Sequence, residues 1–229
     1  MAEVIEISRL ALHDQVAFRL RTMLVEGRIP PGAKLNEREL CEQLRVSRTP
    51  LREAIKLLAG EGLVDLVPNR GAVAVTLTEA DVLHTFEVLA SLEGLSGELA
   101  AQRVTEQELA EVRALHYEML ACFARRELSG YYRHNANIHA AINNIAKNPV
   151  LTSTYRAINA RVQFLRFRTN QNEARWKQAV EEHEAMLKAL DARDAAGLRA
   201  ILMEHVMHKR DAVLMFMRTG DSYPRTAKT

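Results

Sequence analysis

Prolines and glycines divide the first third of the chain into three short stretches in which apolar residues recur at helical spacing. The apolar positions are Val16, Leu20, Met23 and Leu24 in the first stretch, Leu40 and Leu44 in the second, and Leu51, Ile55 and Leu58 in the third. The run at 30–32 (PPG) ends the first stretch and Gly60 ends the third. Asn36, with Glu39 three residues later, and Ser47 are placed to cap the second and third helices. The pattern predicts three short helices in close succession.

Two short apolar segments follow, at residues 64–67 (VDLV) and 72–75 (AVAV). The four residues between them, 68–71 (PNRG), include a glycine, and this arrangement is typical of a β-hairpin. It is the only strand pattern in the sequence. Three helices followed by a hairpin is the order of a winged helix-turn-helix, in which the third helix reads the major groove of DNA.

The rest of the chain has a helical pattern almost throughout, rich in Ala, Leu, Glu and Arg. The predicted helices span residues 79–101, 106–126, 129–146, 149–169, 174–191 and 195–217. The sequence therefore predicts a mainly α protein. Residues 1–77 form the winged helix-turn-helix with its β-hairpin wing, and residues 78–218 form an all-α bundle of six or seven helices. Residues 219–229 form a polar tail that we expect to be disordered.

Composition excludes several classes of protein. The 229 residues are 48% apolar, too many for a disordered chain, and suffice for two folded domains. The 31 Lys and Arg nearly balance the 29 Asp and Glu, so any nucleic-acid site must be a local patch. Cys41 and Cys122 cannot make a disulfide framework or a cysteine-based zinc site. The N-terminus lacks a signal-peptide pattern and no apolar run reaches about 18 residues, so we expect a cytoplasmic protein with no membrane partner.

A local basic patch is predicted on the third helix. Its basic residues are Arg45, Arg48, Arg52 and Lys56. They recur every three or four positions with Glu53 as the only acid among them, so four positive charges and one negative give +3. Ser47, Arg48 and Thr49 lie at the helix N-terminus, which favours phosphates, and Arg70 at the hairpin tip would reach the backbone or the minor groove. Charge alone fits a DNA-binding face and a solvated helix face equally well.

The motifs in residues 31–71 resemble the DNA-binding domain of the GntR family of bacterial transcription regulators. The family pattern has PG-x-x-L-x-E, then V-S-R-T-P-x-R-E-A-L, then E-G-L and a wing ending in R-G. The matching residues are Pro31-Gly32, Leu35, Glu37, the run 46–50 (VSRTP), Arg52-Glu53-Ala54, Glu61-Gly62-Leu63 and Arg70-Gly71, with Ile55 in place of the usual Leu. The resemblance implies that DNA is contacted by Arg38, Arg48, Thr49, Arg52 and Gly71. Together with Ser47 and Arg70, these residues make up the predicted DNA site.

Three histidines lie on the apolar faces of three different predicted helices. Asn135 and His139 are four residues apart and share one face, while His183 and His205 lie between apolar residues of two later helices. A buried imidazole needs a partner for each ring nitrogen, and a shared divalent metal would serve all three rings. Each histidine alone is equally consistent with an ordinary core residue, so the pattern leaves both interpretations open.

This helical region resembles the FCD effector domain of FadR-like members of the family. The family motifs are D/N-x-x-x-H, E-H and a further His about 22 residues later; here they are 135–139 (NANIH), Glu182-His183 and His205. The resemblance implies that Asn135, His139, His183 and His205 bind a divalent metal ion, zinc or nickel. Asn135 stands where many members have Asp, which removes one negative charge. Neutral ligands leave the charge of the metal available to an anionic effector.

An anionic effector needs a cation, and here the sequence departs from the family. Many members have an Arg four residues before Glu93, where this chain has Leu89. Arg161 and Arg166 on the fourth predicted helix of the bundle are the candidates for the effector site, with Arg168 as a third. Because arginines are usually exposed, each of them is also consistent with a surface position.

These features together predict a ligand-responsive transcription regulator, not an enzyme, that represses a metabolic operon and senses a small carboxylated metabolite. We expect a homodimer on an inverted repeat, because two joined heads enlarge a small interface with double-stranded DNA. The alternative is a metal-dependent hydrolase or lyase fused to a DNA-binding head. Glu182 and Glu184 beside His183 favour that alternative, and the lack of an H-E-x-x-H motif opposes it. An architectural DNA protein without sequence preference is disfavoured by the near-neutral charge.

Overall fold

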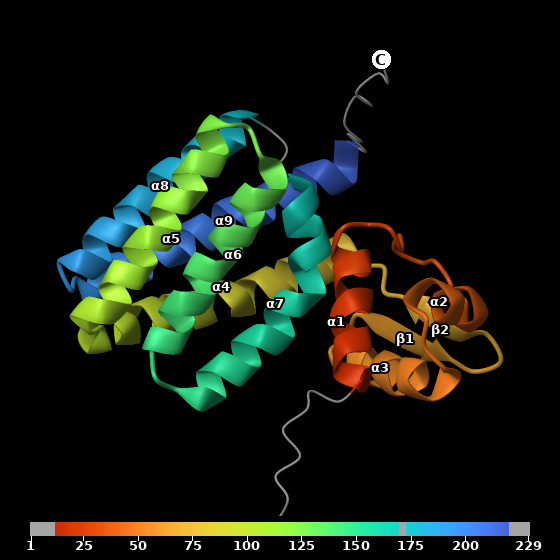
Figure 1. The fold of residues 1–229 in the computed structure, drawn as a ribbon. Coiled ribbons are helices and arrows are strands. Elements are labelled where there is room, and N and C mark those ends of the chain that lie inside the picture. Colours follow the sequence, from red (N-terminus) through yellow and green to blue (C-terminus); the bar gives the residue numbers. More distant parts are fainter. Residues whose placement is uncertain (1–11, 170–172, 220–229) are drawn as a thin grey trace, which may run out of the picture. The chain divides into compact units, whose positions relative to one another are not determined.

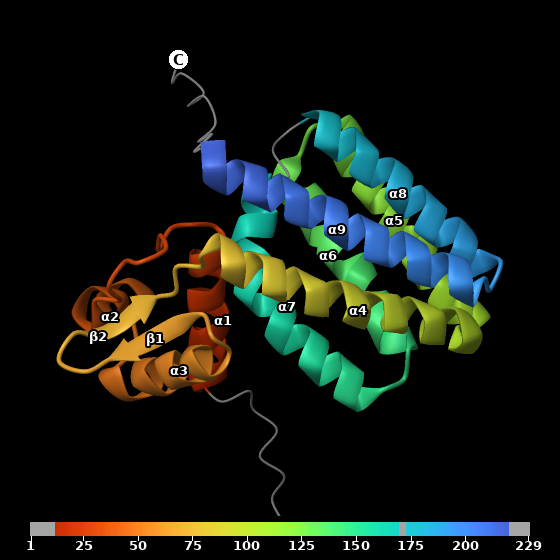
Figure 2. The same cartoon turned by 180° about the vertical axis from the view of Figure 1, so that it is seen from behind.

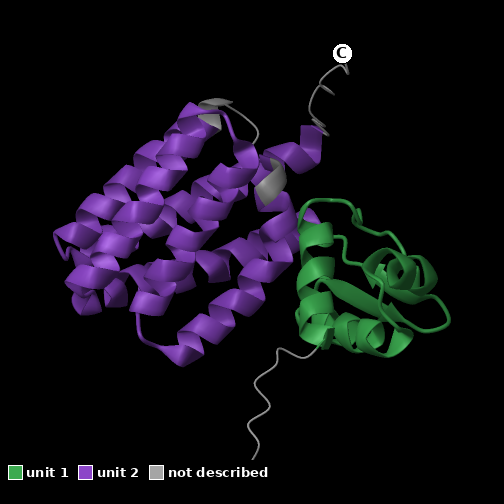
Figure 3. Ribbon diagram, in the orientation of Figure 1, with its two compact units in different colours: residues 1–76 green, residues 77–229 purple. Residues whose placement is uncertain are grey.

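The computed structural model of the protein describes residues 12–169 and 173–219. The chain divides into two compact units, residues 1–76 and 77–229 (Figure 3), one residue away from the division expected after residue 77. Each unit has its own hydrophobic core, and each is described here by itself.

The N-terminal unit contains three helices followed by a two-stranded hairpin (Figure 1), which confirms the predicted winged helix-turn-helix. Its elements are α1 (Leu12–Val25), α2 (Glu37–Leu44), α3 (Arg48–Gly60), β1 (Val64–Val67) and β2 (Gly71–Ala74). The apolar faces expected from the sequence form the core, where Leu20, Leu51 and Leu58 are fully buried. Because α1 packs against the apolar face of α3, the basic face of α3 stays exposed to solvent.

The helix caps agree with the sequence at one position and differ at another. The Asn36 side chain accepts a hydrogen bond from the backbone N–H of Arg38, as a capping residue does, and its amide donates to Glu39 Oε1 at 2.6 Å. Ser47 occupies the N-cap position of α3, but its hydroxyl makes no capping hydrogen bond. The expectation that Ser47 caps the third helix is therefore wrong for its side chain, which is exposed at the helix start.

The hairpin pairs β1 and β2 antiparallel, with Val67 opposite Gly71. Gly71 therefore belongs to the strand, and the turn has three residues rather than the four expected. Asn69 (φ 60°) and Gly71 (φ 87°) both have the left-handed backbone conformation. Asn and Gly adopt this conformation more readily than other residues, which explains why a tight turn forms at this sequence.

The C-terminal unit is an all-α bundle, as predicted, and its six helices in the described residues agree with the predicted number. They are α4 (Glu79–Arg103), α5 (Glu106–Ala124), α6 (Leu128–Ile145), α7 (Pro149–Thr169), α8 (Glu173–Asp191) and α9 (Ala195–Thr219). Two capping boxes, Thr78 with Asp81 and Thr105 with Glu108, start α4 and α5. Helix α9 includes Thr219, which was expected to begin the polar tail, and the rest of that tail lies outside the described residues.

Helices α4 and α9 lie side by side along much of their length (Figure 2). Two glycines permit this close approach: a Cβ atom on Gly94 would lie 2.6 Å from Met203 Cγ, and one on Gly97 would collide with Leu202. Helix α4 also packs against α6, α7 and α8. It therefore brings a single face, which includes Glu93, into the interior where these helices converge.

Candidate functional site

The N-terminal unit contains a cleft between the first turns of α2 and α3 and the tip of the hairpin. We call it the basic cleft, because its charged lining residues are Lys34, Glu37, Arg38, Glu39, Arg48, Arg52 and Arg70. Five positive and two negative charges give it +3 in a chain whose net charge is only +2. Such a local excess of positive charge suits the phosphate backbone of DNA.

The structure brings most of the predicted DNA-site residues together in this cleft. Arg38, Arg48, Arg52, Arg70 and Gly71 all line it. The other two predicted residues, Ser47 and Thr49, are exposed at the N-terminus of α3, outside the lining. There the first free N–H groups of the helix and the two hydroxyls offer hydrogen bonds to phosphates or base edges.

Three details of the basic patch differ from the sequence analysis. Arg45 is the C-cap of α2 with a left-handed backbone (φ 55°), so it does not lie on the third helix as expected. Lys34 and Asn69 line the cleft but were missed. Lys34 pairs with Val73 in an isolated β-bridge, and this contact with a distant strand left no pattern in the local sequence.

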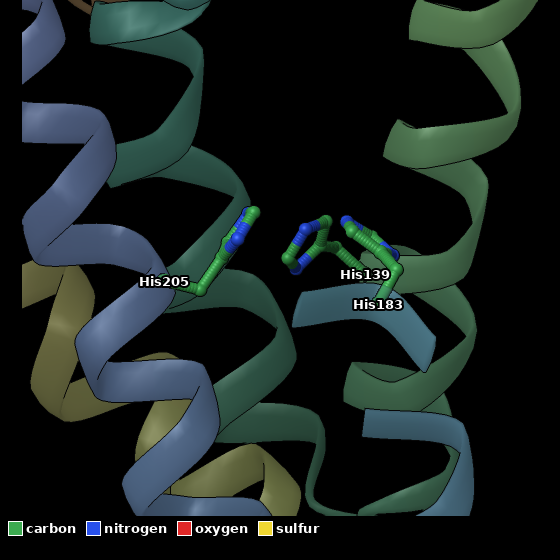
Figure 4. Close-up of side chains that lie close together, drawn as sticks. All are labelled: His139, His183 and His205. Carbon is green, nitrogen blue, oxygen red and sulfur yellow. The ribbon is translucent and has the colours of Figure 1, made fainter. Parts of the chain in front are cut away.

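The bundle interior holds a cluster of three buried histidines, His139 on α6, His183 on α8 and His205 on α9 (Figure 4). Their ring centroids are 5.0 to 5.1 Å apart. One nitrogen of each ring lies within 4.8 Å of the others. The structure therefore gathers into one place three side chains that are separated by 44 and 22 residues along the chain. We refer to them as the histidine cluster.

Polar side chains surround the histidine cluster. The Asn135 amide lies 2.6 Å from His183 Nε2, and Glu182 Oε2 lies 2.5 Å from His205 Nδ1. Glu93 Oε2 lies 2.7 Å from His139 Nδ1, although the angle is not that of a hydrogen bond. Both nitrogens of His139 and Nδ1 of His183 are buried without a hydrogen-bond partner.

Unpaired buried nitrogens are costly, and a shared cation would pair one nitrogen of each ring. Three imidazoles with an amide beside them are donors that zinc, nickel and similar divalent ions accept. The residues present therefore fit a divalent metal ion. Four donors leave positions open on a six-coordinate ion such as nickel, whereas zinc, which is usually four-coordinate, would take a further ligand only by expanding to five-coordination.

Burial sets the protonation of the cluster. It lowers the pKa of His183 well below the ordinary 6.5 and that of His205 to about 4, although Glu182 raises the latter. Both imidazoles are therefore neutral at pH 7, which is the form that binds metals. A further histidine, His116, is buried on α5, where its Nε2 lies 2.9 Å from Glu184 Oε2.

A buried ion pair adjoins the histidine cluster. Glu93 on α4 and Arg166 on α7 are both buried, with 3.4 Å between Glu93 Oε1 and Arg166 Nη1. Arg166 also donates to Asn159 Oδ1 at 2.6 Å. Burial alone raises the pKa of Glu93, but its interactions with His139 and the positive charge of Arg166 outweigh burial and lower the pKa to about 2. The carboxylate is thus ionised at neutral pH.

The two candidate effector arginines lie in different surroundings. Arg166 is buried beside the histidine cluster through Glu93, whereas Arg161 is exposed and its charge acts on Asp81. The structure therefore does not bring Arg161 to the site. The Arg168 side chain lies outside the described residues. Glu93 itself was missed as a site residue, and the one sequence signal for it was an acid on the buried face of a predicted helix.

Comparison with known families accounts for most of the chain. The model of the bacterial regulatory proteins of the gntR family matches residues 12–73, and the model of the FCD domain matches residues 84–208. The chain belongs to the GntR family of transcriptional regulators and carries an FCD domain. The basic cleft lies in the GntR part, and the histidine cluster lies in the FCD part.

Relatives of known name are transcription regulators. The chain is 31% identical to the Nta operon transcriptional regulator of Aminobacter aminovorans over 86% of this chain and 91% of that protein. It is 24% identical to the HTH-type transcriptional repressor RspR of Escherichia coli, over 88% and 89% of the two chains. A probable D-xylose utilization operon transcriptional repressor of Paenarthrobacter nicotinovorans is 26% identical, over 87% and 88%. These relatives confirm the prediction that the chain is not an enzyme and oppose the hydrolase or lyase alternative.

Solved structures show the same fold. E. coli McbR/YncC matches 91% of this chain and 100% of its own with a TM-score of 0.83 at 24% identity. A putative GntR regulator from Rhodococcus sp. RHA1 covers 93% and 99% with a TM-score of 0.74 at 19% identity. Within the described residues, no helix is both long and apolar enough to cross a membrane.

Proposed function

We propose that this regulator represses a metabolic operon and binds an inverted-repeat operator as a homodimer. Its affinity for the operator falls or rises when a small organic acid binds in the FCD domain. The observation that carries the sensing part is the histidine cluster, with buried ring nitrogens that lack partners. The names of the relatives support repression of a metabolic operon: two of them are named as repressors, and two are named for an operon that they regulate. A repressor of the chromosome works in the cytoplasm, so we place the protein there.

At the operator, the residues of the basic cleft and of the start of α3 would contact different parts of the DNA. Arg48 and Arg52, on successive turns of α3, would face base edges in the major groove, where arginine can hold guanine through two hydrogen bonds. Arg38, Ser47 and Thr49 would bind phosphates. The hairpin tip, with Arg70 and Gly71, would follow the backbone beside the groove.

A homodimer follows from the size of this interface. One head with a helix of 13 residues makes few base contacts, so a single head would bind weakly and with little discrimination. Two heads held one helical turn or more apart read a palindromic site. We assign the dimer contact to the FCD part, and static light scattering of the purified chain tests it.

In the FCD part, Asn135, His139, His183 and His205 would hold a divalent metal, zinc or nickel. When bound, the metal supplies a positive centre to which a carboxylate can coordinate. The chain's own residues prepare the site: burial keeps the imidazoles of His183 and His205 neutral, and Glu182 holds the ring of His205 through Nδ1. Because Asn135, His183 and His205 are neutral ligands, they do not offset the metal charge, which favours an anionic effector.

Arg166 would provide the second positive charge for the effector. It is the buried cation next to the cluster, whereas the position at which many relatives carry Arg is the buried Leu89. Glu93 neutralises Arg166 in this structure, so an effector carboxylate would have to compete with Glu93 or bind beside it. An effector changes DNA binding only if its affinity differs between the two arrangements of the heads.

One experiment tests the regulator and another tests the sensor. Genomic fragments bound by the purified protein are selected at near-physiological salt; a shared inverted repeat is expected, and the absence of any common sequence would contradict a specific operator. The metal content of wild-type protein and of His205→Ala is measured by elemental analysis. Organic acids are then screened for their effect on the melting temperature. The double variant Glu93→Gln/Arg166→Gln, which leaves no buried charge unpaired, should lose any response to an acid.

A further inference from the structure

Glu37 is an acidic residue in a cleft whose overall charge is positive. It is the first residue of α2, and it lines the basic cleft together with Arg38, Arg48 and Arg52. A carboxylate at this position repels the phosphates that the cleft would otherwise attract. Its presence therefore calls for a role that offsets this repulsion.

The contact that Glu37 makes indicates this role. Arg52 on α3 donates from Nε to both carboxylate oxygens of Glu37, at 3.1 Å to Oε1 and 2.9 Å to Oε2. The side chains of Arg52 and Glu37 are 60% and 35% exposed, and a pair this exposed contributes little to the stability of the fold. The pair links α2 to α3 at residues that face the cleft, so its effect should fall on what the cleft binds.

The choice of nitrogen matters for DNA recognition. Arginine has one Nε and two terminal amino groups, and it reads guanine by donating two bonds to O6 and N7. Both hydrogen bonds from Arg52 to Glu37 come from Nε, so the two terminal groups are not used on Glu37. A long, exposed side chain otherwise samples many rotamers, and holding it at Nε reduces the entropy lost when it contacts a base.

We propose that Glu37 is a positioning residue for sequence discrimination: it holds Arg52 for base recognition and, by its charge, weakens binding to DNA of any other sequence. The inference rests on the proposed role of Arg52 at the operator. It predicts different effects on the two kinds of DNA when the carboxylate is removed. Binding to the preferred sequence should weaken, while binding to unrelated sequence should stay equal or tighten.

The test uses the full chain and two duplexes of about 30 base pairs, roughly three helical turns. One carries the sequence that the wild-type protein selects from a random library, and the other has the same composition in scrambled order. Affinities are measured by fluorescence anisotropy at one salt concentration. For Glu37→Gln we expect the affinity for the selected duplex to fall by a factor of roughly five or more. A factor of about five is the lower end of the effect of one bidentate base contact. We expect equal or tighter binding of the scrambled duplex.

Three further variants make the result interpretable. Glu37→Asp keeps the charge on a shorter side chain, so it should lose discrimination without gaining affinity for scrambled DNA. Glu42→Gln removes the same charge from α2, where Glu42 is 71% exposed and outside the cleft lining. Because Glu42 lies 3.9 Å from Arg38, which is assigned to phosphates, this variant should change affinity for both duplexes by the same factor and leave discrimination unchanged. Arg52→Ala should itself reduce discrimination. If it changes binding to neither duplex, the proposed role of Arg52 fails, whatever Glu37 does.

If Arg52→Ala reduces discrimination, every other outcome for Glu37→Gln overturns the inference. Equal tightening on both duplexes would make Glu37 a general repulsive charge. Equal weakening would make it a support of α2, and no change would make the contact incidental. A repeat of the library selection with Glu37→Gln should show relaxed preference at one base pair in each half-site. A selected sequence identical to that of the wild type would also refute the proposal.

Discussion

Replacing Glu93 by Gln is expected to destabilise the C-terminal unit by roughly 3 kcal/mol in metal-free protein at pH 7. The substitution keeps the size of the side chain and removes its charge. The pKa of Glu93 is about 2 in the folded protein against an ordinary 4.5. Burial alone would raise this pKa, but the interactions with His139 and the positive charge of Arg166 lower it further than burial raises it. The difference of about 2.5 units, at about 1.4 kcal/mol per unit, gives the expected loss.

The loss should depend on pH with a definite sign. Because the pKa of Glu93 is lower in the folded than in the unfolded protein, the stabilisation is fully present above pH 4.5 and is lost as the pH falls towards 2. The free energy of unfolding of the wild type should exceed that of Glu93→Gln by roughly 3 kcal/mol at pH 7 and by roughly half as much at pH 3.

The single tryptophan allows the C-terminal unit to be followed alone. Trp176 packs edge-on against Tyr131, with ring centroids 4.9 Å apart, in the helical unit. Its fluorescence during urea unfolding, after metal removal with a chelator, gives the free energy of that unit. The control is Glu98→Gln on the same helix, where Glu98 and Arg199 form a pair 35% and 45% exposed. The control should lose less than about 1 kcal/mol. An equal loss in the two variants, or a Glu93→Gln loss that does not change with pH, would refute the electrostatic argument.

Three further predictions concern DNA, metal and packing. Arg48→Ala should cost roughly 1–3 kcal/mol on the selected operator and relax base preference, and an equal loss on scrambled DNA would remove it from base readout. His183→Ala should lose bound metal in elemental analysis and lower the melting temperature, and unchanged metal content would make it a core residue. Gly97→Leu should lower the free energy of unfolding of the bundle by roughly 1–3 kcal/mol or more, because the added side chain has to enter the space filled by Leu202. An unchanged urea midpoint would show that α4 and α9 do not pack this closely.

The elements of the fold could be predicted where local signals decide them. Thr78 and Asp81 are three residues apart, and together they cap α4 with no help from distant parts of the chain. The predictions were wrong where a distant contact or a single backbone angle determines the structure of a residue. Arg45 matches the spacing of the basic residues on the third helix, yet its left-handed backbone ends α2. Gly71 has the composition of a turn residue but pairs with Val67, and only the strand register shows this.

The site could be predicted in part for a related reason. Helical periodicity places His139, His183 and His205 on apolar faces, so their burial follows from the sequence, but periodicity assigns no partner to a charged residue. Arg161 and Arg166 are five residues apart, about 140° around α7, so only one of them can face the interior. The structure buries Arg166, whose partner Glu93 lies 73 residues earlier on another helix. A buried charge is stable only beside its partner, so Arg166 could have been distinguished from Arg161 only through Glu93, and no spacing within α7 contains that information.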